Sequence, residues 1–195
     1  MFIKNTTMSF EIDLEKCLTV LENGGVILYP TDTVWGLGCD ATNENAVDLI
    51  YKLKRRSEKK SMIIFLEDET KIIDFARTPN NKINIIITEL KKPITVIYPN
   101  AKNLAANLIN EDGTIAIRIP SDEFCNQLLK AFGRPIVSTS ANISGEKTAA
   151  NFKEISKIIK EKVNYVCSYR QNDETTAKPS KIVKWNDDDT IEVLR

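Results

Sequence analysis

Short polar side chains are concentrated in one segment, Ser138–Gly145, whose sequence is STSANISG. The segment follows a short apolar run, Pro135-Ile136-Val137, and precedes a stretch with helical character that starts near residue 151. Hydroxyls, an amide and free backbone N–H groups at a strand-to-helix junction suit the binding of an anion or a small polar ligand. A Ser/Thr-rich turn that caps the next helix is the alternative interpretation. The segment is therefore one candidate ligand site.

A second candidate is a basic run at residues 52–60, which carries six positive charges in nine residues. Its cations are Lys52, Lys54, Arg55, Arg56, Lys59 and Lys60. A solvated helix end would explain the run, because cations favour the negative end of the helix dipole. Two functional interpretations compete with it. One is a patch for nucleic acid, and the other is a clamp in which arginine and lysine bind the oxygens of a polyphosphate.

Two further polar groups lie at or within apolar strands. The segment Thr31–Thr33 follows the apolar run 26–29, and ligands gather at strand ends in open α/β sheets. After it, Gly36 and Gly38 permit turns with positive φ or close approach to a ligand. Thr114 and Arg118 lie four residues apart, so they share one face of a strand. An arginine there is costly unless it is paired, which predicts either a buried ion pair with Asp or Glu or contact with an anion.

Apolar periodicity predicts the elements that position these groups. Helices are expected over residues 10–21, 43–53, 83–90, 124–132 and 152–159, although the isoleucines at 85–87 could also form a strand. Strands are expected over residues 26–29, 62–66, 94–98, 115–119, 136–137, 163–167, 182–185 and 190–194. The alternation predicts an α/β fold, and the polar stretch 168–178 predicts a surface loop. A length of 195 residues favours one domain.

Composition excludes several classes of function. The chain has no histidine, which rules out Ser-His-Asp and Cys-His catalysis and removes the usual zinc ligand. The 27 basic and 27 acidic residues cancel, so no global field attracts nucleic acid or membrane. The four cysteines are scattered without a C-x-x-C pair, as in proteins of a reducing cytoplasm. We see neither a signal peptide nor an apolar stretch long enough to span a membrane, and expect a cytoplasmic protein.

Five motifs in order carry a resemblance to a known family. They are PTDTVWGLGCDA at 30–41, KRR at 54–56, RIP at 118–120, STSANISG at 138–145 and PSKIV at 179–183. Together they resemble the YrdC-type threonylcarbamoyl-AMP synthases of the wider YrdC/YciO-like family, over residues from about 25 to 195. The resemblance implies a single YrdC-like domain over residues 1–195. Its expected fold is one twisted sheet of mixed strand direction, flanked by helices, with a concave, positively charged cleft.

The resemblance also implies an activity, that of a nucleotidyltransferase. The enzyme would make L-threonylcarbamoyl-AMP and pyrophosphate from L-threonine, bicarbonate and ATP, for tRNA threonylcarbamoyladenosine modification by downstream transfer proteins. ATP is then a substrate that carries Mg²⁺, and no metal is held by the protein itself. Weak binding of tRNA, or of double-stranded RNA, is a further expectation. A YciO-like RNA- or nucleotide-binding protein without this activity is the alternative.

The family's site residues can be transferred position by position. The implied catalytic residues are Lys54 and Arg56. The implied nucleotide-binding residues are Arg56, Lys60, Thr114, Ser140, Asn142, Thr148 and Arg195, and the implied threonine-binding residues are Thr33, Arg118, Ser138 and Ser180. The mechanism expected from this set is positioning and charge neutralisation, and no residue is an obvious general base. The sequence departs from the family pattern at Arg55, usually glycine, at Phe65, usually histidine, and at Lys181, usually threonine.

Overall fold

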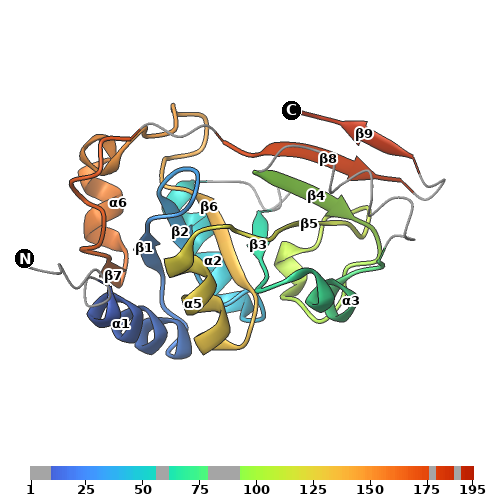
Figure 1. The fold of residues 1–195 in the computed structure, drawn as a ribbon, viewed down its shortest axis with the longest axis horizontal. Helices are drawn as coiled ribbons and strands as arrows, with labels where there is room; N and C mark the ends of the chain where they lie inside the picture. Colours follow the sequence, from blue (N-terminus) through green and yellow to red (C-terminus); the bar gives the residue numbers. More distant parts are fainter. Residues whose placement is uncertain (1–9, 56–61, 79–92, 176–178, 187–189) are drawn as a thin grey trace, which may run out of the picture.

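The strands of the computed structural model form one mixed sheet. The structure describes residues 10–55, 62–78, 93–175, 179–186 and 190–195. Within these segments nine strands pair in the order β7-β1-β2-β6-β3-β5-β4-β8-β9 (Figure 1). The pairs β1–β7, β3–β5 and β4–β8 are parallel, and the other neighbours are antiparallel. The α/β class and the mixed strand direction are thus confirmed, while the single domain over residues 1–195 stays a prediction.

The elements mostly follow the expected order. The strands are β1 (Ile27–Tyr29), β2 (Gly36–Gly38), β3 (Ile63–Phe65), β4 (Ile94–Tyr98), β5 (Ile115–Arg118), β6 (Ile136–Ser140), β7 (Tyr165–Val166), β8 (Lys181–Trp185) and β9 (Ile191–Val193). The helices are α1 (Glu11–Glu22), α2 (Glu44–Lys54), α3 (Ile72–Phe75), α5 (Glu123–Phe132) and α6 (Lys157–Lys162). Short 3₁₀ turns cover Glu69–Lys71, Ala106–Leu108 and Phe152–Glu154. The helix expected over residues 83–90 lies outside the described residues.

Strand β2 was not expected, because its sequence Gly-Leu-Gly is typical of a turn. It pairs with β1 on one side and β6 on the other. Neither of its glycines has a positive φ, so a turn with positive φ, one of the two possibilities that the sequence left open, does not form there. The glycines are instead required by space. A Cβ on Gly38 would lie 2.7 Å from Tyr29 Cε1, and a Cβ on Gly36 would lie 3.2 Å from Ser138 Oγ.

The first three residues of the Ser/Thr segment belong to a strand, and the alternative of a turn applies only to the residues after Ser140. Strand β6 continues to Ser140, and its last three residues pair with Ile63, Leu37 and Gly36. The backbone groups of this stretch therefore serve the sheet, and only the chain after Ser140 turns. Further along, the helix expected over 152–159 is divided into a 3₁₀ turn and α6. Helix α6 begins after Ser156, whose hydroxyl accepts the backbone N–H of Ile159.

The polar segment after β7 is a loop of turns, as expected, and one buried carboxylate anchors its start. Asp13 of α1 is only 4% exposed. It accepts the hydroxyl of Tyr165 and the backbone N–H groups of Ser168 and Tyr169. Because a buried carboxylate is stable only when it is hydrogen-bonded, this contact fixes where the chain leaves β7. Among the described helices, none combines the length and apolar character that crossing a membrane requires.

We predict that the end of α2 is strained at Arg55. This residue has φ of 50°, in the left-handed region, which glycine adopts freely and a residue with a Cβ adopts only at a cost. Replacing Arg55 also removes a cation at the helix end, so Arg55→Ala is the matched control. Arg55→Gly is expected to exceed Arg55→Ala by about 1 kcal/mol in free energy of unfolding. Urea denaturation measures the difference, and equal stabilities of the two variants would contradict a strained left-handed residue.

Candidate functional site

The residues expected at the site gather around one cavity of about 450 Å³. It lies between the loop that connects β1 to β2, the strands β3, β5 and β6, and the segment that enters β8. Seven predicted site residues line it: Thr33, Arg118, Ser138, Ser140, Thr148, Ser180 and Arg195. They come from positions 33 to 195, so the fold brings them together from nearly the whole chain. The positive charge of the cleft stays a prediction.

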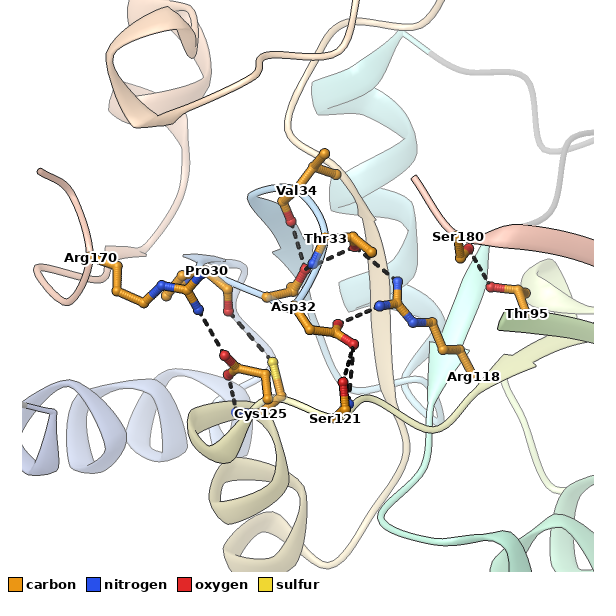
Figure 2. A network of polar contacts seen from close by, with 12 residues as sticks. Pro30, Asp32, Thr33, Val34, Thr95, Arg118, Ser121, Cys125, Arg170 and Ser180 are labelled. Atoms are coloured by element: carbon orange, nitrogen blue, oxygen red, sulfur yellow. Dashed lines mark hydrogen bonds and ion pairs between the residues drawn. The ribbon is translucent and has the colours of Figure 1, made fainter. Parts of the chain in front are cut away.

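Arg118 is the most constrained of these residues. It is 4% exposed and forms an ion pair with Asp32 through Nη2 (Figure 2). Its Nη1 donates to the hydroxyl of Thr33 at 2.9 Å, and its Cζ lies 5.4 Å from the centre of the Phe65 ring. The second oxygen of Asp32 accepts the backbone N–H and the hydroxyl of Ser121, at 3.1 and 3.0 Å. The predicted ion pair is therefore present, and the same arginine also borders the cavity.

A hydroxyl turn holds the loop that carries Thr33. The hydroxyl of Thr31 donates to the carbonyl of Val34 at 2.8 Å and accepts the backbone N–H of Thr33 at 3.1 Å (Figure 2). The hydroxyls of Thr31 and Thr33 are themselves 3.1 Å apart. Such side-chain bonds to nearby backbone are a usual way for threonine to stabilise a turn. They place the Thr33 hydroxyl between the turn and Arg118.

The far side of the cavity is formed by the segment before β8. The hydroxyl of Ser180 is buried and shares a hydrogen bond of 2.8 Å with Thr95 (Figure 2). The Ser180 carbonyl accepts Nε and Nη2 of Arg195 at 3.2 and 3.0 Å. Ser180 thus connects strand β4 with Arg195. The guanidinium of Arg195 keeps further N–H groups for a ligand, since these two bonds use two of its five donors.

Lys54 lies behind the cavity rather than in its lining. It is 1% exposed, and its ammonium donates to the carbonyls of Ser140 and Asn142, the latter at 2.8 Å. The Asn142 side chain donates to the carbonyls of Ile143 and Glu146, and its Oδ1 is buried with no partner among the described residues. Lys54 is therefore not at a solvated helix end. It binds the two carbonyls at the turn that follows β6.

Thr114 also lies outside the lining, because a local turn uses its hydroxyl. That hydroxyl donates to Asp112 at 2.7 Å and accepts Nδ2 of Asn110 at 2.9 Å. The bond from Thr114 is the main cause that lowers the pKa of Asp112 from its ordinary value. Asn110 borders the cavity in its place. The predicted residues Arg56 and Lys60 lie outside the described residues.

Sequence reasoning did not assign several contributors to the site. Asn110 and Met62 line the cavity without any distinguishing pattern around them. Asp32 was considered only as part of the polar segment 31–33 at a strand end, although the search for a carboxylate partner of Arg118 could have pointed to it. The expectation that Phe65 lies at the cleft is met, since it lines the cavity, while Lys181 is exposed at the start of β8.

The site offers anion-binding groups more than titrating ones. Burial raises the pKa of the Tyr29 hydroxyl and of the Cys39 and Cys125 thiols well above their ordinary values. These groups therefore stay protonated and neutral near pH 7. Within the described segments, no cluster of three or more His, Cys, Asp or Glu side chains is able to hold a metal ion. Arginines, hydroxyls and backbone groups are what the cavity presents, which suits binding and orientation of charged substrates.

Comparisons with known proteins agree with this geometry. The Sua5/YciO/YrdC family model, described as telomere recombination, matches residues 19–195. A threonylcarbamoyl-AMP synthase of Pseudoalteromonas translucida is 35% identical over 161 residues, which are 81% of this chain and 86% of that protein. A second, from Hahella chejuensis, is 34% identical over 172 residues, covering 87% of this chain and 91% of the relative.

Solved structures show the same fold. P. abyssi Sua5 complexed with L-threonine superposes with a TM-score of 0.82 at 22% identity, over 95% of this chain. This chain spans 54% of that longer one. E. coli YciO superposes with a TM-score of 0.78 at 23% identity, over 94% of this chain and 88% of its own. With a family match over most of its length, relatives above 30% identity and this fold, the chain belongs to the Sua5/YciO/YrdC family.

Proposed function

We propose that this protein synthesises L-threonylcarbamoyl-AMP from L-threonine, bicarbonate and ATP, with release of pyrophosphate. The observation that carries the proposal is the single cavity that brings Arg118, Thr33 and Ser138 together with Ser140, Thr148 and Arg195. It has one group of residues for a small amino acid and another for a nucleotide. Relatives named threonylcarbamoyl-AMP synthase, which this chain matches over most of their length, support the assignment.

In the proposed threonine subsite, Arg118 binds the carboxylate of the amino acid. A guanidinium matches a planar carboxylate with two parallel hydrogen bonds. The hydroxyls of Thr33 and Ser138 border the same part of the cavity as Arg118 and complete the polar lining. Ser180 acts at the opposite wall, where its carbonyl orients Arg195. The ring of Phe65 gives this subsite an apolar side.

In the proposed nucleotide subsite, Ser140, Thr148 and Arg195 contact ATP directly, and Asn142 and Thr114 support the surrounding turns. Lys54 is assigned a positioning part in catalysis, because its ammonium holds the turn after β6. Arg56 and Lys60 are assigned to the phosphates on the family pattern. Mg²⁺, arriving with ATP, would offset phosphate charge.

The proposed reaction forms two bonds in turn. Bicarbonate dissociates to carbon dioxide and hydroxide. The neutral amine of threonine attacks the carbon of carbon dioxide, and the proton that the amine loses converts the hydroxide to water, which leaves a carbamate. A carbamate oxygen then attacks the α-phosphate of ATP, and pyrophosphate leaves. The protein contributes orientation and charge neutralisation, which can supply a large part of such a rate enhancement. We assign no general base.

The proposed setting is tRNA modification in the cytoplasm. The adenylate would pass to downstream proteins that transfer the threonylcarbamoyl group to tRNA. Direct binding of tRNA or double-stranded RNA stays a prediction. The second candidate, a YciO-like protein without synthase activity, is favoured by one observation, namely that Phe65 occupies the place of the family's usual histidine.

A pyrophosphate-release assay tests the function. The wild type is expected to release pyrophosphate from ATP only when L-threonine and bicarbonate are both present. Arg118→Lys keeps the charge but loses the planar fork, so it should reduce turnover at low threonine by about tenfold or more. Pyrophosphate release that does not depend on threonine would contradict the proposal. The absence of any pyrophosphate release when all three substrates are present would also contradict it.

A second prediction concerns Lys54. Lys54→Met keeps most of the side-chain volume but leaves two buried carbonyls without their charged donor. Such bonds are worth roughly 1.5–3 kcal/mol each, so we expect about 2 kcal/mol or more of lost stability, together with weaker ATP binding. Lys52→Met is the control for stability, because Lys52 is exposed on the same helix. Urea denaturation and calorimetry with ATP measure both effects. Unchanged stability in Lys54→Met would mean that Lys54 does not hold the turn.

A third prediction concerns pH. The turnover rate is expected to rise from neutral into mildly alkaline pH, because threonine must lose an amine proton before it forms a carbamate. Burial raises the pKa of Cys125, so its thiol remains protonated over this range and adds no ionisation of its own. A pH–rate profile at saturating substrates should therefore keep its midpoint in Cys125→Ala. If the midpoint moves in this variant, a protein thiol titrates and the positioning mechanism is wrong.

A further inference from the structure

The carboxylate of Asp32 pairs with the guanidinium of Arg118, the group that we propose binds the amino acid. Asp32 pairs with Arg118 through Oδ1, and its side chain is 13% exposed (Figure 2). It does not line the 450 Å³ cavity. Instead it borders a smaller cavity of about 150 Å³, together with Arg170 and Asp173. Asp32 therefore contacts Arg118 without lining the cavity of the proposed substrate.

The donors of Arg118 can be counted. A guanidinium has five N–H groups in one plane. One on Nη1 goes to Thr33 and one on Nη2 goes to Asp32. Three remain, namely the second N–H on each Nη and the N–H on Nε, which is buried without a partner among the described residues. Since Arg118 lines the larger cavity, a planar carboxylate bound there can take up donors that the protein leaves unused.

The contacts around Arg118 also fix its orientation. Asp32 holds one amino group, Thr33 holds the other, and the ring of Phe65 lies near the guanidinium face. Asp32 is held in turn, because its Oδ2 accepts two bonds from Ser121, three residues after Arg118. A carboxylate that is fixed in this way compensates a buried charge and prevents rotation of the guanidinium plane.

We propose that Asp32 is a positioning residue, which orients the Arg118 guanidinium for a planar carboxylate and is itself fixed by Ser121. Only the identity of that carboxylate, L-threonine, rests on the proposed function. Asp32 acts through Arg118 and does not touch the substrate. Its loss affects the amino-acid subsite and leaves the nucleotide subsite, formed by Ser140, Thr148 and Arg195, unchanged.

Calorimetry with L-threonine and with ATP separates positioning from general support of the fold. Asp32→Asn is expected to weaken threonine binding about tenfold or more and Ser121→Ala about threefold, with ATP affinity unchanged in both. Asp173→Asn is the matched control, because Asp173 borders the same small cavity but pairs with Arg170. It should change neither affinity. An equal loss of both ligands in Asp32→Asn would mean a structural role only and would overturn the proposal.

A readout without ligand keeps this test independent of the proposed substrate. In ¹⁵N spectra of the arginine side chains, a fixed guanidinium gives separate, slowly exchanging Nη signals, and Arg118→Lys identifies those of Arg118. These signals should average in Asp32→Asn while the backbone spectrum stays folded. Unchanged Arg118 signals in a folded Asp32→Asn would refute the positioning role. Averaged signals in a protein whose wild type binds no L-threonine would support the positioning role and reject the proposed substrate.

Discussion

The buried ion pair between Arg118 and Asp32 is the constraint around which the site is organised. Arg118 ends strand β5 inside the sheet, where an unpaired charge would be strongly destabilising. Its partner comes from the loop between β1 and β2, far away in the sequence. The pair therefore ties that loop to β5, and it fixes the Thr33 hydroxyl beside the guanidinium. The same contact compensates the charge of Arg118 and shapes the proposed amino-acid subsite.

A second buried charge serves the other end of the cavity. The Lys54 ammonium ends helix α2 and binds two carbonyls at the turn after β6. Strand β6 can then present hydroxyls to the cavity while its backbone is used by β2 and β3. Neither the Arg118 guanidinium nor the Lys54 ammonium is freely exposed to solvent. Both act first on the protein's own backbone or carboxylates, and this gives the cavity a fixed shape before any substrate arrives.

The departure at Phe65 changes the character of the site. Where the resembling family usually has a histidine, an aromatic ring lies near the Arg118 guanidinium. A cation near an aromatic face is attracted by the ring electrons, so Phe65 can help to orient Arg118. It cannot exchange a proton. The thiols of Cys39 and Cys125, whose pKa values are raised by burial, lie outside the cavity lining, which agrees with the proposed mechanism of positioned substrates.

The sequence by itself determined the α/β class, the family and seven of the residues that line the cavity. Apolar periodicity and the five ordered motifs are patterns of residues close together in the sequence, so they can be recognised without knowing which residues are in contact in the fold. Tertiary structure decided the rest. It made Gly-Leu-Gly a strand, because β1 and β6 pair with it on both sides, and the ring of Tyr29 leaves no room for a Cβ at Gly38. It turned Lys54 inward and gave Arg118 its partner Asp32 from 86 residues away. Such choices depend on which groups meet in space, and charge compensation at a buried site is set by neighbours that sequence spacing does not reveal.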